Sequence, residues 1–216
     1  MVTLSQLIDE SSAYDPFKSD YAVDAKDLAF VPSGEMNLPT AYGNVLLKPT
    51  EHAYTGVFTR LGEVVYDSPL PRKHMLGIPR NLMAHDLNTL MPMMNSAKRA
   101  PWLIRGYDDI ARASLTAEYT PVDNTEVLKT VAEAVTNRVF KCEEINRPIV
   151  TADQIYVKIT GVNVQTQDGN YGIGAMVRND EIGKGRVAAM GYLKRGKCDN
   201  SIPLHSRKNG RNTVQN

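Results

Sequence analysis

The strongest constraint on this 216-residue chain is a change of hydrophobic period at its centre. From Ala111 to Tyr119, apolar and polar residues alternate, which is the period-two pattern of a half-buried strand. Residues 102–107 predict a partner strand, joined to the first through Asp108 and Asp109. A β-hairpin with one buried face is therefore expected here.

A well-marked helix is expected directly after the hairpin. Asp123 stands at the N-cap position with Glu126 three residues later, and Val122 and Val127 occupy the two positions of a hydrophobic staple. Apolar residues then recur at helical spacing: Leu128, Val131, Val135 and Val139. This face is predicted to pack against a sheet.

Three further strands are expected after Pro148. In residues 154–164, Ile155, Val157 and Ile159 alternate with polar neighbours. Residues 171–198 supply two more strands around a turn at 179–185. The order of hairpin, helix and antiparallel β-meander predicts an α+β fold whose N-terminal part is helical and preceded by an extended arm.

The N-terminal half is divided by turn signals. Asp15-Pro16 and Leu38-Pro39 interrupt the candidate elements of residues 1–48, which predicts an extended acidic arm. A short helix is expected from about Thr50, its N-cap, to Gly62. We therefore expect three parts: an arm at 1–48, an α+β domain at 49–202 and a basic mobile tail at 203–216.

Residues 70–94 are rich in methionine and are split by prolines into short helical pieces. Packing is the expected role of Met75, Met83, Met91, Met93 and Met94, because no cysteine joins them to form a copper or cofactor site.

The net charge of +1 hides a marked asymmetry. Residues 1–35 hold two basic and seven acidic side chains, a net −5, whereas residues 182–216 hold eight basic and one acidic, a net +7. The arm could cover a basic surface, the basic end could bind an anion such as nucleic acid, or both ends could simply be solvated. No signal peptide or membrane span is visible, so a cytoplasmic protein without a membrane partner is expected.

Motifs for catalysis, metals and cofactors are not recognised in the sequence. Cys142 and Cys198 are far apart and have no CxxC partner, which favours structural thiols over a metal or redox role. The glycine-rich segments 172–174 and 182–186 lack the spacing of a phosphate loop and are better explained as hairpin turns. We expect no enzyme, no metal and no cofactor.

Cationic and tyrosine side chains alternate with buried residues in the predicted strands, and such faces can neutralise phosphates and stack bases. The candidate nucleic-acid-binding residues are Arg105, Tyr107, Arg112, Tyr156, Lys158, Arg178, Arg186, Tyr192, Lys194 and Arg195. An ordinary wet sheet face, with tyrosine and lysine side chains reaching to solvent, is the alternative.

The hairpin and helix also carry a recognisable combination of motifs: Trp102-Leu103-Ile104-Arg105, Ala111-Arg112-Ala113, Tyr119 and Asp123-Asn124. MVRNDEIGKG at 176–185 and KCDNSI at 197–202 add a turn and an end motif, with Asp180 and Ser201 as departures. Over residues 45–202 the chain resembles the phage/plasmid-like family known as the domain of unknown function nine hundred and thirty-two. The resemblance implies a mobile-element origin and no established activity. The element order is also similar to the core of phage single-strand annealing proteins.

These observations favour a phage- or plasmid-encoded DNA-binding protein that holds single-stranded DNA in recombination or replication. One alternative is a structural phage protein that binds another protein through residues 70–94. The other is a metal-dependent nuclease built on the pairs Asp108-Asp109 and Asp180-Glu181, although adjacent carboxylates in turns are more often solvated or capping groups. Whether the chain forms a homo-oligomer stays open.

Overall fold

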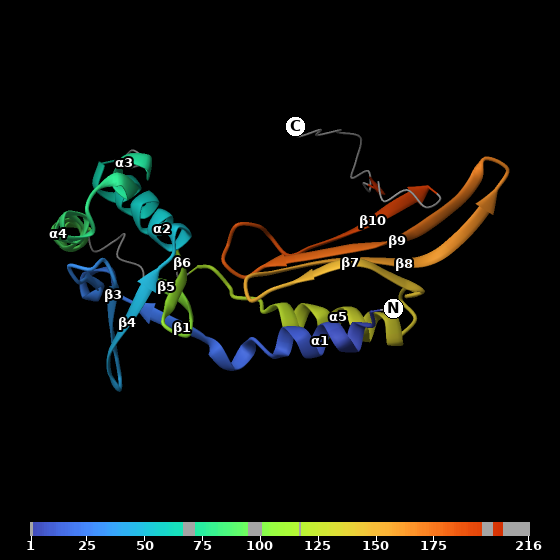
Figure 1. Cartoon of the computed structure of the whole chain (residues 1–216), viewed down its shortest axis with the longest axis horizontal. Coiled ribbons are helices and arrows are strands. Elements are labelled where there is room, and N and C mark those ends of the chain that lie inside the picture. The colour runs from blue at the N-terminus through green and yellow to red at the C-terminus, as the bar shows by residue number, and fades with distance from the viewer. Residues whose placement is uncertain (1, 67–71, 95–100, 117, 196–200, 205–216) are drawn as a thin grey trace. The chain divides into compact units, whose positions relative to one another are not determined.

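The computed structural model describes residues 2–66, 72–94, 101–116, 118–195 and 201–204, and its fold is α+β, as predicted (Figure 1). Contacts divide the chain into two compact units. We call residues 14–121 the central unit, and residues 1–13 with 122–216 the terminal unit. The boundaries expected after residues 48 and 202 do not coincide with this division, because segments distant in sequence pair within each unit. None of the described helices is long and apolar enough to cross a membrane.

A six-stranded sheet of order β1-β5-β6-β4-β3-β2 forms the centre of the central unit. Its strands are β1 (Lys18–Val23), β2 (Ala29–Phe30), β3 (Met36–Thr40), β4 (Gly43–Pro49), β5 (Trp102–Tyr107) and β6 (Ile110–Thr116). Neighbouring strands are antiparallel apart from the parallel pair β4 and β6. The predicted β5–β6 hairpin is confirmed, with Asp108 in the left-handed region at its turn.

Residues 1–48 are not an extended arm, which corrects the expectation from their turn signals. β1 pairs along its whole length with β5, and β2, β3 and β4 form consecutive antiparallel pairs. The turn at residues 31–35, where the Gly34 amide donates to the Val31 carbonyl at 2.7 Å, links β2 to β3. The turn signals therefore separate short strands, and distant pairing supplies the hydrogen bonds that local sequence lacks.

The helices of the central unit are α2 (Glu51–Leu61), α3 (Arg72–Gly77) and α4 (Arg80–Leu90). Short helical turns occur at η1 (Asp15–Phe17), η2 (Ala25–Asp27), η3 (Gly62–Tyr66) and η4 (Met91–Met93). Thr50 is the N-cap of α2 as predicted, because its side chain accepts a hydrogen bond from the Ala53 amide at 3.1 Å. Gly62 has a helical φ of −58°, so the chain continues into the π-helical turn η3.

Four of the methionines in residues 70–94 are core residues, which confirms the packing interpretation for Met75, Met83, Met91 and Met94. Met93 is 62% exposed and is the exception. The buried methionines of this segment therefore face the central core, whereas Leu82 and Met93 are exposed.

An antiparallel sheet of order β11-β10-β9-β8-β7 forms the terminal unit, with two helices along one side (Figure 1). Its elements are α1 (Leu4–Ser12), α5 (Asn124–Thr136), β7 (Glu144–Val150), β8 (Gln154–Thr166), β9 (Gly169–Asp180), β10 (Ala188–Arg195) and β11 (Ser201–Leu204). The predicted three-stranded meander is confirmed as β8–β10, and β7 and β11 extend it at both edges. β11 contains Pro203 and Leu204 of the expected tail; residues 205–216, and Cys198, lie outside the described residues.

β7 was not predicted, because Pro148 indicated a loop. Proline is tolerated on edge strands and at bulges, and β7 is an edge strand with an irregular register between Asn146 and Ile149. Arg147 adopts a φ of 41° within this bulge. The bulge therefore keeps the strand paired with β8 despite the proline.

The apolar sides of α1 and α5 pack against one face of this sheet. Leu128 and Val131 of α5 belong to the same core as Ile155, Val157 and Ile159 of β8, as the alternation predicted. Further along the predicted stripe, Val135 is only half-buried, and Val139 lies beyond the end of α5 and is exposed. A capping box that was not predicted, Thr3 with Gln6, starts α1.

Buried polar side chains fix the N-terminus of α5. Asp123 holds the N-cap position but makes no capping hydrogen bond, and the Asn124 amide instead donates to the Glu181 carboxylate at 2.7 Å. Asn179 donates to the Val122 carbonyl at 2.7 Å and to the Asn124 side chain at 3.0 Å. Glu181, which lies in the turn between β9 and β10, therefore caps α5 in place of Asp123. A carboxylate at this position interacts favourably with the positive end of the helix dipole.

Removing this carboxylate is expected to destabilise the protein. E181A should lower the free energy of unfolding by about 1–3 kcal/mol, because a buried helix-end amide loses its acceptor. Urea denaturation measures the change. E133A is the matched control, since Glu133 is exposed on the same helix, and its cost should stay below about 0.5 kcal/mol. Equal stability of the two variants would contradict the capping role.

Candidate nucleic-acid interface

The face of the terminal sheet that points away from α1 and α5 carries the candidate site. Side chains alternate across a strand, so the neighbours of the buried Ile155, Val157 and Ile159 lie on this opposite side. Strand register then places residues of three strands together on it: Tyr156, Lys158 and Thr160 of β8, Met176 and Arg178 of β9, and Met190, Tyr192 and Lys194 of β10. We call this surface the open face.

Two hollows lie on the open face. The first, of about 280 Å³, is lined by Asn146, Arg147, Ile149, Tyr156, Lys158, Tyr192 and Lys194. The Lys158 ammonium lies 5.8 Å from the centre of the Tyr156 ring, so a cation and an aromatic face are presented together. We call it the Lys158 hollow.

The second hollow, of about 570 Å³, shares Ile149 and Tyr156 with the first. Its cationic lining comes from Arg178 on β9 and from Lys184 and Arg186 in the following turn. We call it the Arg178 hollow. The two hollows therefore form one continuous basic stretch across the sheet.

The floor of the Lys158 hollow is a chain of hydrogen bonds. The Asn146 amide donates to Thr160 Oγ1 at 3.1 Å, and Thr160 Oγ1 lies 2.7 Å from the Tyr192 hydroxyl. Tyr192 is only 1% exposed, and its ring passes over Gly174. Tyr192 therefore builds the floor and is not available to stack on a base, which corrects its predicted role.

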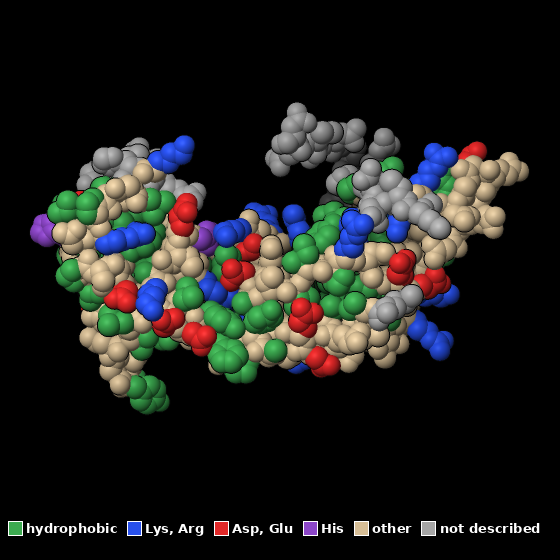
Figure 2. Space-filling model, viewed as in Figure 1, with side chains coloured by type: hydrophobic (Ala, Val, Ile, Leu, Met, Phe, Trp, Pro, Cys, Tyr) green, Lys and Arg blue, Asp and Glu red, His purple; other side chains and the backbone are tan. Residues whose placement is uncertain are grey.

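The open face is strongly cationic. Among the described residues that line the two hollows, Asp180 is the single carboxylate, and its Oδ1 accepts from the Ile182 and Lys184 amides at 3.1 and 3.0 Å. Figure 2 shows Lys and Arg side chains along the upper margin of this sheet and several carboxylates on the helical side below. An anionic ligand is therefore favoured on the open face.

Arg105, Tyr107 and Arg112 do not belong to the open face, because β5 and β6 are in the central unit. Arg105 is 1% exposed, and its Nε donates to Asp20 at 2.9 Å. Arg112 is 4% exposed, and its Nε donates to the Gly106 carbonyl at 3.3 Å. These arginines are structural, and their burial withholds them from a phosphate.

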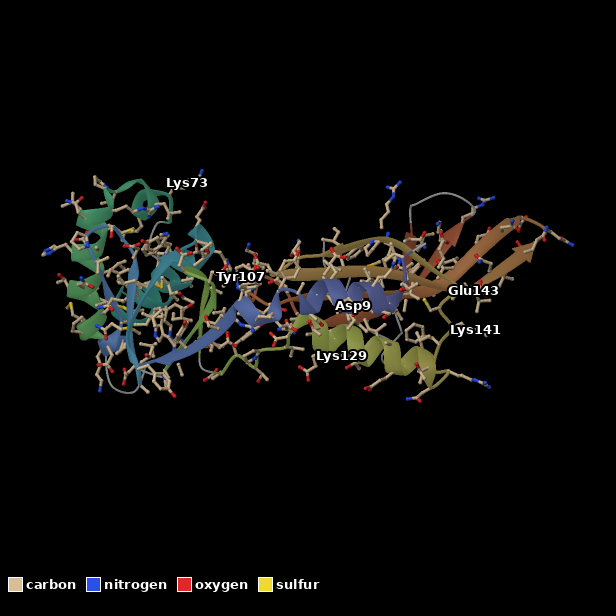
Figure 3. The ribbon with its side chains drawn as sticks, turned by 60° about the horizontal axis from the view of Figure 1, so that its bottom comes forward. Asp9, Lys73, Tyr107, Lys129, Lys141 and Glu143 are labelled. Carbon is tan, nitrogen blue, oxygen red and sulfur yellow. The ribbon has the colours of Figure 1, made fainter. Side chains whose placement is uncertain are left out.

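Tyr107 and Arg195 also have local partners. The Tyr107 ring, labelled in Figure 3, packs on Phe17 with ring centres 5.7 Å apart. Arg195 neighbours Lys194 on β10 and so points to the other side of the sheet, where it donates to the Asp168 carbonyl at 3.1 Å. Of the predicted residues, the open face thus brings together Tyr156, Lys158, Arg178, Arg186, Tyr192 and Lys194.

Two cationic residues of the hollows were missed by sequence reasoning. Arg147 lies in the bulge of β7, where Pro148 indicated a loop, and Lys184 was read only as part of a glycine-rich turn. The available signal was their nearness to the predicted strands: a hairpin turn necessarily lies at the end of the strands it joins.

Three of the four carboxylates proposed for a nuclease, Asp109, Asp180 and Glu181, have structural partners. Asp109 accepts from the Lys48 ammonium at 2.6 Å, and this hydrogen bond lowers the pKa of Asp109. Asp180 orders its turn and Glu181 caps α5, whereas Asp109 belongs to the other unit. Within the described ranges, no group of three or more His, Cys, Asp or Glu residues is placed to hold a metal.

Burial raises the pKa of the Cys142 thiol, which disfavours the reactive thiolate.

Comparisons of the chain with protein-family models, curated proteins and solved structures found no match. The resemblance to the phage/plasmid-like family and to single-strand annealing proteins therefore stays a prediction from motifs and element order. The functional argument depends on the geometry of the open face.

The floor of the Lys158 hollow can be tested through its glycine. A Cβ at Gly174 would come within 2.0 Å of the Ile159 carbonyl oxygen and 2.8 Å of the Tyr192 ring. G174A should therefore lower the free energy of unfolding by about 1–3 kcal/mol. G191A is the control, because its nearest atoms at 3.6 Å are in ordinary contact. Thermal denaturation compares the two, and equal melting temperatures would contradict the close packing.

Proposed function

We propose that this protein is a DNA-binding protein of phage or plasmid type that holds single-stranded DNA on the open face without cleaving it. The observation that carries the proposal is the basic stretch formed by the two hollows, which gathers cations from β7–β10 and their turns beside an accessible tyrosine. Such binding would hold single strands for annealing during recombination or replication.

Phosphate neutralisation supplies the affinity in this proposal. Lys158 and Lys194 flank the first hollow, and Arg178 and Arg186 flank the second. Lysine and arginine side chains of this kind release counterions from a DNA strand, and the resulting affinity depends on salt and not on base sequence. The shared lining of the two hollows gives the strand a continuous path.

Base stacking supplies the second contribution. Tyr156 is half-buried, lines both hollows and sits directly opposite Arg178 in the sheet register. A tyrosine in this position can stack on an unpaired base, whereas the bases of a duplex are stacked on one another and covered by their backbones. Tyr156 therefore favours a single strand over a duplex.

The other two functions have less support. Binding of a protein partner through residues 70–94 would need their apolar side chains at the surface, and most of the methionines there are buried. The nuclease needs adjacent carboxylates to share a metal, and Asp109, Asp180 and Glu181 already hold the structural roles described above.

Replacing the lysines of the first hollow tests the phosphate contacts. K158A/K194A should weaken binding of a fluorescent oligo-dT in anisotropy titrations, because two cations are lost. The slope of log affinity against log salt should fall by about 0.7 for each lost contact.

K129A is the matched control for this double variant. Lys129 is exposed on α5, on the helical side of the sheet (Figure 3), so its loss should leave both affinity and slope nearly unchanged. If the wild-type protein did not bind the oligonucleotide at low salt, or if the three proteins bound equally, the proposal would be wrong.

Removing the accessible ring tests stacking separately from charge. Y156A should weaken single-strand binding by about 1–3 kcal/mol and leave the salt slope unchanged, because no phosphate contact is lost. Y156F should retain most of the affinity, since the ring is kept. The same titration with duplex DNA is the comparison, and a Y156A loss of the same size on duplex DNA would count against stacking on a single strand.

A further inference from the structure

The described helices cover the helical side of the terminal sheet only in part. The hydroxyls of Ser11 in α1 and Thr125 in α5 lie 2.9 Å apart, so α1 runs along one flank of α5. An apolar groove of about 300 Å³ lies along the other flank, with Val127 and Val131 of α5 on one wall and residues 187–189 on the other. Because the strand order is β7-β8-β9-β10-β11, β10 and β11 extend the sheet beyond this groove.

Strand register places aliphatic side chains on this uncovered part of the helical side. Val177 of β9 belongs to the core under α5, and Ala189 of β10 lies opposite it. Alternation from there puts Leu193 on the same side, between Ile173 of β9 and Ile202 of β11. We call the whole surface the apolar strip: Val162, Val164, Ile173, Val187, Leu193, Ile202 and Leu204.

The apolar strip is too exposed and too continuous to be an ordinary scatter of surface residues. Apart from the partly buried Leu193, its members are between 39% and 65% exposed. With a rise of about 3.3 Å per residue and strands about 4.8 Å apart, the strip spans roughly 300–400 Å² of sheet. An apolar patch of this size on a monomer is often functional. The adjoining groove along α5 brings the area to the roughly 500 Å² per copy that a specific dimer needs.

The segments of the chain that adjoin β11 are too polar to cover the strip. Residues 196–200 and 205–216 contain Cys198 and Val214 as their apolar side chains, and the rest are polar, charged or glycine. Nucleic acid is also a poor match, because the strip has no charged member. The cover that fits best is a second surface of the same aliphatic kind, which another copy of the chain provides.

We propose that the apolar strip is the interface of a symmetric dimer, in which the strips of two copies pack face to face. A two-fold axis along the strands would stack the two sheets about 10 Å apart, as in a β-sandwich. The same axis would bring α5 of each copy beside the edge strand β11 of the other, where unpaired backbone groups need protection. Glu126 lies at the outer rim of the groove, where it stays exposed to water. Both open faces point away from this interface.

The oligomeric state of the full-length protein without DNA tests the proposal. In sedimentation equilibrium the wild type should behave as a dimer with a micromolar or tighter dissociation constant. I202K should raise this constant at least about tenfold, because two lysines would be desolvated against each other in a two-fold interface. V139K is the matched control: Val139 is 75% exposed beyond the end of α5 and is not part of the strip, so its dimer should be unchanged.

A second variant guards against a local effect of I202K. I173K places the same charge on β9, two strands away in the register, and should weaken the dimer as I202K does. Melting temperatures measured at a concentration where all proteins are monomeric check that the variants fold. The proposal is overturned if the wild type is monomeric up to high micromolar concentration, or if both folded strip variants dimerise as tightly as V139K. None of these results depends on whether the open face binds DNA.

Discussion

The buried carboxylate of Glu181 at the start of α5 is the interaction on which the architecture of the terminal unit depends. It satisfies the Asn124 amide from the turn between β9 and β10, and the Glu181 amide in turn donates to the Asp153 carbonyl in the turn between β7 and β8. Two turns of the sheet are thereby tied to one helix end. α5 covers one face of the sheet. Because successive side chains of a strand point to opposite faces, every second residue of each strand lies on the other face. A register shift of one residue would exchange Lys158 for Val157 and bring lysine into the core.

Local patterns predicted the elements whose stability is decided locally. The alternation in β8 and the apolar stripe of α5 are strong periodic signals, and the N-cap of α2 needs only Thr50 and the amide of Ala53. Pairing of distant segments could not be predicted. β1 is recognised as a strand only when β5, some eighty residues later, is in place beside it, since Asp20 faces Arg105 across the pair. The cap of α5 shows the same limit, because its carboxylate comes from position 181 and not from Asp123.

The sequence predicted the candidate site where strand alternation alone decides on which side of the sheet a side chain lies. It could not predict the site where exposure depends on other elements that cover the sheet. Lys158, Arg178 and Lys194 come together because the registers of β8, β9 and β10 align them. Arg112 obeys the same alternation, yet β6 is buried on both sides, so its polar positions are enclosed. Alternation therefore states which side chains share a face, and only the tertiary structure states whether that face meets solvent.

The chemistry of the open face also bears on specificity. Reading a base sequence requires donors and acceptors held in a fixed pattern: arginine or lysine side chains read guanine, and asparagine or glutamine side chains read adenine. Among the amide residues that line the hollows in the described part of the chain, Asn146 is committed to Thr160 and Asn179 to Val122 and Asn124, whereas Gln154 is exposed. What remains for a ligand is mainly lysine, arginine and a tyrosine ring, which contact phosphates and base planes common to all sequences. If the proposed function holds, contacts of this kind would accept a strand of any sequence, as annealing of single strands would require.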